Sequence, residues 1–327
     1  MRRVLRGAFL NTMEKYYPSY YNEFSCLAGE CPDSCCTKWE IVIDECTLNK
    51  YNALSTDFGN EVLSQIIKDE EGDCCFLLNN GRCPFLNSHN LCDIHIKLGE
   101  DFTSEICRNH PRFIEEYDGF TEISLSLSCP EANRIIMSSE KSVYPTPLYK
   151  GDDEVLELLI SSREKLLSSD LGFSSLIKLL LDAAADDSLD IDLVYIENHP
   201  DINVAFLKNL ASFLLRKSEI LTNEWKAYLE NAEGVGISDE EFEAYCKSND
   251  EALVKICRYF IYRYYLKAVN DLDIYSRALF IASSCLFPAF IACSCNVTLW
   301  EAARLFSKET EHNLFNLDLL LGFFSEF

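Results

Sequence analysis

The sequence is poor in basic residues. Its 327 residues include 29 Lys and Arg but 53 Asp and Glu, which gives a formal net charge of −24. A surface of this sign repels the phosphates of nucleic acids, so we expect no nucleic-acid partner. Solubility alone accounts for an acidic surface, and a basic protein partner would also fit it.

Motifs of several common enzyme classes are also missing. The sequence contains no GxGxxG turn, P-loop or internal repeat, and no C-x3-C-x2-C triad of the kind that radical S-adenosylmethionine enzymes use. A pair of C-x2-C knuckles, usual in four-cysteine zinc sites, is absent as well. The sequence therefore gives no indication of radical chemistry or of an ordinary zinc ribbon.

The chain shows no clear export signal. Residues 1–6 are basic, but the apolar run that follows at 7–10 is too short for the core of a signal peptide. We therefore expect a cytoplasmic protein with reduced cysteines. Residues 278–300 carry no charge and are long enough to span a bilayer, but they include hydroxyl side chains and Pro288. We expect a helix buried at the centre of a bundle, and no membrane partner.

Cysteine is the residue type that the sequence has in excess. Eleven of its sixteen cysteines precede Pro130, and four of these lie within the eleven residues 26–36. Such density is explained by disulfides in an oxidising compartment or by thiolate ligation of a metal or an iron–sulfur cluster. In a reducing compartment the second explanation is favoured.

Eight cysteines are the candidate ligands, and eight are more than one tetrahedral site needs. Adjacent Cys35 and Cys36 cannot easily bind one ion together, so either one of them packs or two centres share the region. The candidates are Cys26, Cys31, Cys35, Cys36, Cys83, Cys92, Cys107 and Cys129. We expect the other eight to be small buried hydrophobic side chains.

Short elements are predicted before residue 130. They are a strand at 39–44, a helix capped by Thr47 that runs to residue 54, and a hairpin at 76–86 around Asn80-Gly81. A second hairpin joins 112–117 to 120–127, and alternation in its second strand predicts one buried and one exposed face. Pro130 is expected to open a helix.

Helical periodicity dominates after the prolines at 145 and 147. The predicted helices are 155–167, 171–185, 204–229, 240–247, 252–269, 274–295, 300–308 and 314–324. We therefore predict a mostly α protein. A small cysteine-rich N-terminal lobe with short β-hairpins (residues 1–143) precedes a C-terminal α-helical bundle (residues 144–327).

The cysteine region resembles a known family. The resemblance lies in Phe24-x-Cys26-x4-Cys31-x3-Cys35-Cys36-x2-Trp39, in Cys83-Pro-Phe-Leu86, Cys92-x-Ile94-His95 and Cys107-x2-His110-Pro111-Arg112, and in residues 124–131. Residues 262–265 and 307–316 add to it near the C-terminus. This pattern resembles the flagellin lysine-N-methylases (the FliB family), within the wider CxxCxxCC group of zinc- or iron-chelating proteins.

The resemblance implies an activity and two cofactors. The activity is transfer of a methyl group from S-adenosylmethionine to the ε-amine of lysines on flagellin, which is the implied partner. The second cofactor is a cysteine-bound [4Fe–4S] cluster, with zinc as the alternative. The cluster would either staple the two lobes together or take part in binding the methyl donor.

Methyl transfer requires that the lysine amine, with a pKa of about 10.4, lose its proton. Desolvation, a nearby carboxylate or tyrosine that accepts the proton, or both can achieve this, and aromatic faces favour the sulfonium. We assign catalytic roles to Glu311, His312 and Tyr262, and cofactor binding to Arg263, Tyr265 and Asn316. A surface helix cap and ordinary core packing are the alternative roles for these residues. The alternative function is a non-enzymatic zinc- or iron-chelating protein, which would not bind S-adenosylmethionine.

Overall fold

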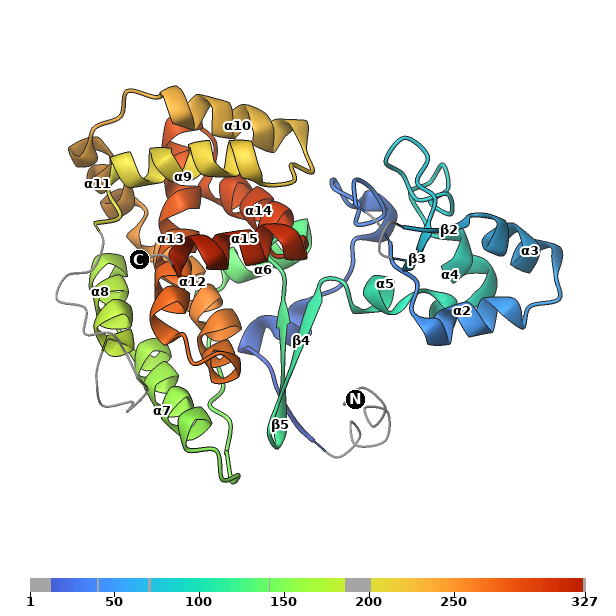
Figure 1. Cartoon of the computed structure of the whole chain (residues 1–327), viewed down its shortest axis with the longest axis horizontal. Helices are drawn as coiled ribbons and strands as arrows, with labels where there is room; N and C mark the ends of the chain where they lie inside the picture. Colours follow the sequence, from blue (N-terminus) through green and yellow to red (C-terminus); the bar gives the residue numbers. More distant parts are fainter. Residues whose placement is uncertain (1–12, 40, 70–71, 141, 186–200, 326–327) are drawn as a thin grey trace.

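A computed structural model describes residues 13–39, 41–69, 72–140, 142–185 and 201–325 (Figure 1). The basic segment 1–6 lies outside the described residues. Figure 1 shows a large lobe of helices and a smaller lobe, which we call the helical lobe (residues 130–325) and the cysteine lobe (residues 36–109). Each lobe has its own hydrophobic core. The predicted mostly α fold with a small β region near the N-terminus is confirmed.

The cysteine lobe is built from short elements around a core that includes Tyr51, Phe76 and Phe85. Its elements are α2 (Glu45–Asn52), α3 (Asp57–Ser64), β2 (Ile66–Lys68), β3 (Cys74–Phe76), α4 (Asp93–Leu98) and α5 (Glu105–Asn109), with the 3-10 turn η3 (Glu100–Phe102). Two further 3-10 turns, η1 (Ser19–Glu23) and η2 (Ala28–Glu30), precede the lobe.

Three local predictions for this lobe are wrong. No strand occupies the described part of 39–44, where Val42 forms only an isolated bridge with Cys75. The cap of α2 is Asp44, whose carboxylate accepts from the Thr47 amide. Asn80 and Gly81 do form a tight turn with positive φ, but it is closed by a single bridge, because β3 pairs with the preceding β2 instead.

The second hairpin lies between the lobes (Figure 1) and is confirmed. β4 (Arg112–Tyr117) pairs antiparallel with β5 (Phe120–Leu125), and β1 (Glu14–Tyr16) adds in parallel to β5. Gly119 supplies the positive φ that the two-residue turn needs. The expected exposed face of β5 is wrong, because Glu122 and Ser124 are buried as well. Polar side chains on this face therefore have partners inside the protein.

Pro130 opens a helix, as predicted, and this helix is the first of the helical lobe. Its helices are α6 (Pro130–Ser138), α7 (Glu154–Ser168), α8 (Phe173–Ala184), α9 (Val204–Lys217), α10 (Asn223–Gly234), α11 (Asp239–Ser248), α12 (Asp250–Tyr264) with η5 (Tyr265–Asn270), α13 (Ile274–Cys295), α14 (Leu299–Thr310) and α15 (Leu314–Phe324). The helix predicted at 204–229 is two helices, because Thr222 caps a new one by accepting from the Trp225 amide. Residues 265–270 form η5 rather than the end of an α-helix.

Helix α13 occupies the centre of the helical lobe, as the uncharged stretch predicted. Nearly all of its residues from Ile274 to Ala292 are buried, and it contacts helices on several sides. Within the described chain it alone is long and apolar enough to cross a membrane, and 78% of its most apolar window is buried inside the protein. Burial of this kind is typical of a core helix, so length and composition are weak evidence for a membrane span.

The hairpin and α6 belong to the core of the helical lobe. Leu125 and Leu127 of the hairpin strand, and Ala132 and Ile135 of α6, belong to the same core as the later helices. The predicted lobe boundary at residues 143–144 stays a prediction. Because the hairpin strand and α6 share this core, polar groups at the end of the hairpin lie directly against α12 and α14.

Candidate functional site

A buried carboxylate lies at the end of α14. Glu311 accepts hydrogen bonds from Tyr259 (2.9 Å to Oε2 and 3.1 Å to Oε1), from Tyr264 (3.1 Å) and from the Ser307 hydroxyl (2.6 Å). The Glu311 side chain is fully buried, and Arg263 Nε lies 3.6 Å from its Oε1. A buried carboxylate is tolerated only when its oxygens are hydrogen-bonded and its charge is balanced, and both conditions hold here.

Arg263 connects this carboxylate to a second one. Its guanidinium also donates to Glu115 on β4 (2.8 Å) and lies 3.6 Å from the centroid of the Phe113 ring. Lys267 pairs with the same Glu115 at 2.6 Å. Although burial would raise the pKa of Glu115, Arg263 and Lys267 outweigh it and hold that pKa below its usual value. The cluster thus brings two cations and two carboxylates together on buried elements of the helical lobe and the hairpin.

His312 follows Glu311 directly and faces the hairpin. Its Nε2 lies 2.8 Å from the hydroxyls of both Ser126 and Ser128. Ser126 also lies 3.3 Å from the Ser307 hydroxyl, which donates to Glu311. A continuous chain of hydrogen-bonding groups, His312–Ser126–Ser307–Glu311, therefore connects the imidazole to the buried carboxylate.

Aromatic rings from the cysteine lobe and the hairpin enclose the imidazole. The ring centroids of Trp39, His110 and Phe113 lie 5.0, 5.3 and 5.0 Å from that of His312. Burial lowers the pKa of His312 to about 3, helped by nearby His110, Arg263 and Lys308. Burial lowers the pKa of His110 to about 4 in the same way. Both imidazoles are therefore neutral at pH 7.

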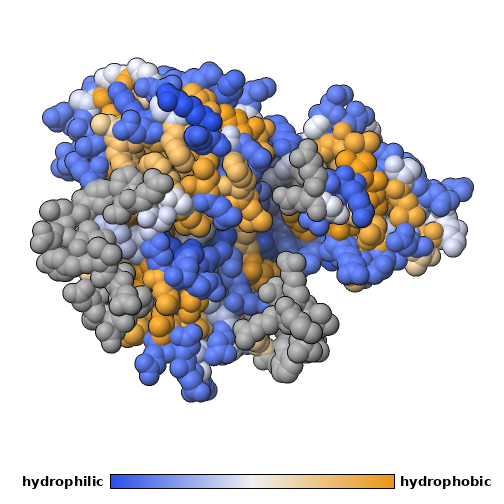
Figure 2. Space-filling view, viewed as in Figure 1, coloured by the Kyte–Doolittle hydropathy of each residue, from blue (hydrophilic) through white to orange (hydrophobic). Residues whose placement is uncertain are grey.

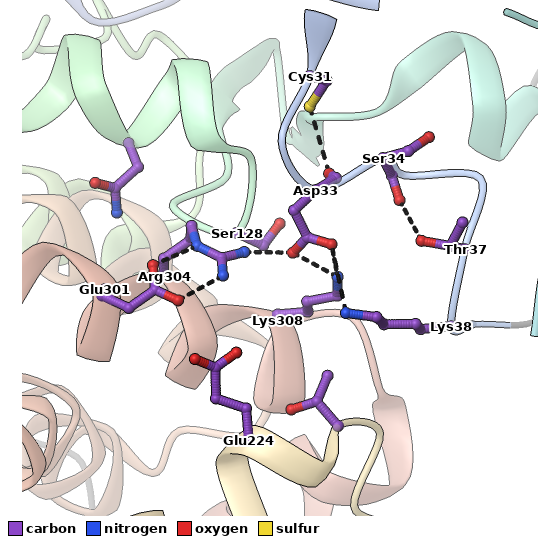
Figure 3. Close-up of polar contacts among 12 residues, drawn as sticks. Cys31, Asp33, Ser34, Thr37, Lys38, Ser128, Glu224, Glu301, Arg304 and Lys308 are labelled. Atoms are coloured by element: carbon purple, nitrogen blue, oxygen red, sulfur yellow. Dashed lines mark hydrogen bonds and ion pairs between the residues drawn. The ribbon is translucent and has the colours of Figure 1, made fainter. Parts of the chain in front are cut away.

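An ion-pair cluster joins the cysteine-rich segment to α14 beside this site (Figure 3). Asp33, between Cys31 and Cys35, accepts from Lys308 at 2.7 and 2.8 Å and pairs with Arg304, which is held on its other side by Glu301. Burial would raise the pKa of Asp33, but the two cations lower it overall. Lys308 also lies over the Trp39 ring. Figure 2 shows hydrophilic surface in the recess between the lobes on the face in view.

The predicted catalytic and cofactor-binding residues fall into two groups. Glu311, His312 and Arg263 lie together in the network. The other three have partners outside the network. Tyr262 donates a hydrogen bond to the Tyr16 carbonyl at 3.4 Å, and the Arg163 guanidinium lies over its ring. Tyr265 is hydrogen-bonded to Ser162, and Asn316 is hydrogen-bonded to Glu219 and Glu309. Their assigned roles stay predictions.

Several residues of the network were not predicted from the sequence. Tyr259, Tyr264 and Asp33 had no assigned role, and Ser126 was expected on the exposed face of the second hairpin strand. One signal was present. The run Ser124-Leu-Ser-Leu-Ser128 repeats hydroxyls at the end of β5 and just after it, where all five residues are buried and hydroxyls need partners.

Four of the eight candidate thiols belong to a hydrophobic core or pack against one. Cys83 is buried in the core of the cysteine lobe, where Cys36 and Cys92 pack against it, whereas Cys129 packs against the core of the helical lobe. The eight candidate cysteines are all described, and none of them forms a disulfide. Among the described residues, no three His, Cys, Asp or Glu side chains are arranged to hold a single metal ion.

Curated proteins similar to this chain carry two names. It is 28% identical to the "Lysine-N-methylase" of Salmonella choleraesuis over 194 residues, which are 53% of this chain and 48% of the relative, and equally to that of Salmonella typhimurium. It is 32% identical to the "Flagellar biosynthetic protein FliU" of Salmonella muenchen over 128 residues, which are 37% of this chain and 75% of the relative. No family model matches, and no solved structure matches.

The fold and the site define a helical protein with a thiol-rich lobe and a buried Glu–His network where the lobes meet. The extent of the match to FliU shows that the chain belongs to the family of FliU and the lysine-N-methylases. It spans about half the length of the lysine-N-methylases that it matches.

Proposed function

We propose that the protein transfers a methyl group from S-adenosylmethionine to the ε-amine of a lysine on a flagellar protein, with flagellin as the expected substrate. The names of the relatives support lysine methylation and a flagellar role. The observation that carries the proposal is the buried hydrogen-bonded path from His312 to Glu311. The methyl donor follows from the motif resemblance.

The network suits the proton transfer that this reaction needs. A lysine amine attacks the sulfonium methyl only after it loses its proton, so the site must accept one. Because the pKa of His312 is low, its imidazole would not keep that proton but would relay it through the Ser126 and Ser307 hydroxyls to Glu311. Arg263 keeps Glu115 as a partner when Glu311 becomes neutral, although Glu115 is shared with Lys267.

The surroundings of His312 also suit a cationic ligand. The rings of Trp39 and Phe113 lie beside the imidazole and already hold the cations of Lys308 and Arg263, an attraction that a sulfonium or an ammonium group would share. The acidic net charge of −24 favours the approach of a lysine-bearing segment. We place the methyl donor and the lysine at this junction of the two lobes.

The thiols support a [4Fe–4S] cluster as the second cofactor. They are free, and thiolates are the usual ligands of such clusters. The choice of the cluster over zinc follows from the motif resemblance, and when bound the cluster would crosslink segments that lack a large core of their own.

Methyl transfer to purified flagellin, measured with radiolabelled S-adenosylmethionine, tests the assignment. We expect His312→Ala to lower kcat by about 10²–10⁴-fold, the usual contribution of a general base, with iron content unchanged. His89→Ala is the matched control, because His89 is exposed in the cysteine lobe. Full activity of His312→Ala would remove the imidazole from the mechanism. A wild-type protein that contains its iron but transfers no methyl group to flagellin would refute the methyltransferase assignment.

A second candidate function is zinc or iron binding without catalysis, which is favoured by Cys83 and the neighbouring Cys36 and Cys92 at the core of the cysteine lobe. Isothermal titration with S-adenosylmethionine separates the two. A methyltransferase binds the donor with measurable heat, whereas a protein that only chelates iron gives none at any protein concentration.

A further inference from the structure

We propose that the free edge of strand β4 is the docking surface for the protein substrate, which adds to this edge as one further strand and so brings its lysine to His312. The inference rests on the proposed lysine methylation and names the form in which the substrate binds, an extended lysine-bearing segment. Unpaired backbone groups, a direct connection to the site and the charge of the edge carry it.

The backbone of β4 has an open edge. The strand order of the sheet is β1-β5-β4, so β4 has a neighbour on one side only. The Ser126 amide donates to the Pro111 carbonyl at 2.7 Å, and in an antiparallel ladder such hydrogen-bonded pairs alternate with pairs that exchange no bond. This alternation turns the amides and carbonyls of Ile114 and Glu116 away from β5. No residue that the structure describes forms a hydrogen bond with them, and a row of this kind is a template for another strand.

The edge leads directly to the site, because the side chains of β4 alternate between its two faces. The Phe113 ring stacks on the His312 imidazole at 5.0 Å, and Glu115 binds Arg263. Ile114, between them, points to the opposite face and is 42% exposed. A strand added beside β4 lies about 4.8 Å from it, and its residue level with Phe113 points to the same face as Phe113. A lysine at that position therefore extends along the Phe113 ring toward His312.

Charge selects a lysine-bearing segment over a second copy of this chain. Glu116 is exposed at the edge, and the Glu115 side chain beside it is 29% exposed. A segment with basic residues around the target lysine gains from both carboxylates. Two copies of this chain, each with a net charge of −24, repel each other. Arg112, the cation of β4, is already held by the Tyr21 hydroxyl and lies over the Phe24 ring.

Proline on the edge strand tests the docking mode, because it removes one outward amide and leaves the bonds between β4 and β5 in place. Ile114→Pro is expected to lower kcat/KM for purified flagellin about tenfold, mainly through KM, as the loss of one or two hydrogen bonds predicts. Lys68→Pro on β2 is the matched control, since the bond from the Asp69 amide to the Asp73 carbonyl turns the Lys68 amide outward in the same way. It should leave kcat/KM unchanged. An unchanged KM in Ile114→Pro, with normal methyl transfer, would overturn the docking mode and leave the proposed function in place.

Backbone methylation of the substrate gives a second measurement that leaves the protein unaltered. The probe is a synthetic peptide that spans a flagellin lysine found methylated by mass spectrometry, and its binding is measured by fluorescence anisotropy without S-adenosylmethionine. The amides of a strand point alternately toward and away from its neighbour. N-methyl groups at every second residue should therefore weaken binding about tenfold, and those at the residues between should not. Equal losses at consecutive residues would overturn strand addition.

Other results separate the docking mode from the proposed function. A wild-type protein that methylates no lysine of flagellin would overturn both, since no substrate would remain to dock. A wild-type dimer in analytical ultracentrifugation that Ile114→Pro converts to a monomer would show that a second copy occupies the edge. That result would overturn the docking mode alone.

Discussion

The two buried imidazoles predict how stability depends on pH. In the folded protein burial lowers the pKa of His312 to about 3 and of His110 to about 4, against about 6.5 in the unfolded chain. Below pH 6.5 the unfolded chain therefore binds protons that the folded protein does not. Stability is fully present above pH 6.5 and is lost as the pH falls toward the two folded values.

The size of the loss follows from the shifts. Each pKa unit is worth about 1.4 kcal/mol, so at pH 5 each histidine costs about 2 kcal/mol and the pair about 4 kcal/mol. A domain is typically stable by about 5–15 kcal/mol, so this loss is large. Urea unfolding, followed by tryptophan fluorescence between pH 7.5 and 4.5, measures it.

A variant separates this effect from the titration of carboxylates at lower pH. His312→Gln should lower the slope of the unfolding free energy against pH by about 1.4 kcal/mol per pH unit between pH 6 and 4.5, which corresponds to one proton fewer bound on unfolding. This holds whatever the substitution does to stability at pH 7.5. His89→Gln should leave the dependence unchanged. An equal slope in His312→Gln and the wild-type protein would mean that the imidazole is hydrated and titrates normally, and the buried site would then be wrong.

Two further predictions concern the charged groups around the site. Glu311→Gln should lower the free energy of unfolding by about 3 kcal/mol in a urea titration, because it removes one of the two carboxylates that balance buried Arg263. Glu309→Gln is the control: Glu309 lies on the same helix but accepts from Thr222 and the Leu221 amide, so its loss should cost about 1 kcal/mol. Equal costs for the two variants would contradict the charge-balancing role of Glu311. Asp33→Asn should cost about 2 kcal/mol and speed proteolysis between the lobes, since Lys308 loses its carboxylate partner. As a control, removing the exposed Lys226–Glu230 ion pair should cost under about 0.5 kcal/mol. If Asp33→Asn costs no more than this control, Asp33 does not hold the lobes together.

Much of the helical lobe could be predicted because its signals are local. Apolar residues at helical spacing gave α7, α8, α11, α13, α14 and α15 to within a few residues, and Pro130 and the Asp118–Gly119 turn marked their elements directly. The break between α9 and α10 was missed, because Thr222 is one of many hydroxyl residues and only its capping contact distinguishes it. In the cysteine lobe the pairing of β3 was missed because an isolated turn signal does not say which neighbour a strand will choose.

The sequence by itself determined the helical class, the thiol-rich N-terminal region and the adjacency of Glu311 and His312, since composition, periodicity and neighbouring residues are all written along the chain. Only the tertiary structure decided what these residues face. Ser126, Ser307, Asp33 and Arg263 are far apart in sequence, and a buried polar group acquires its partners, its charge balance and its pKa from whatever the fold packs against it.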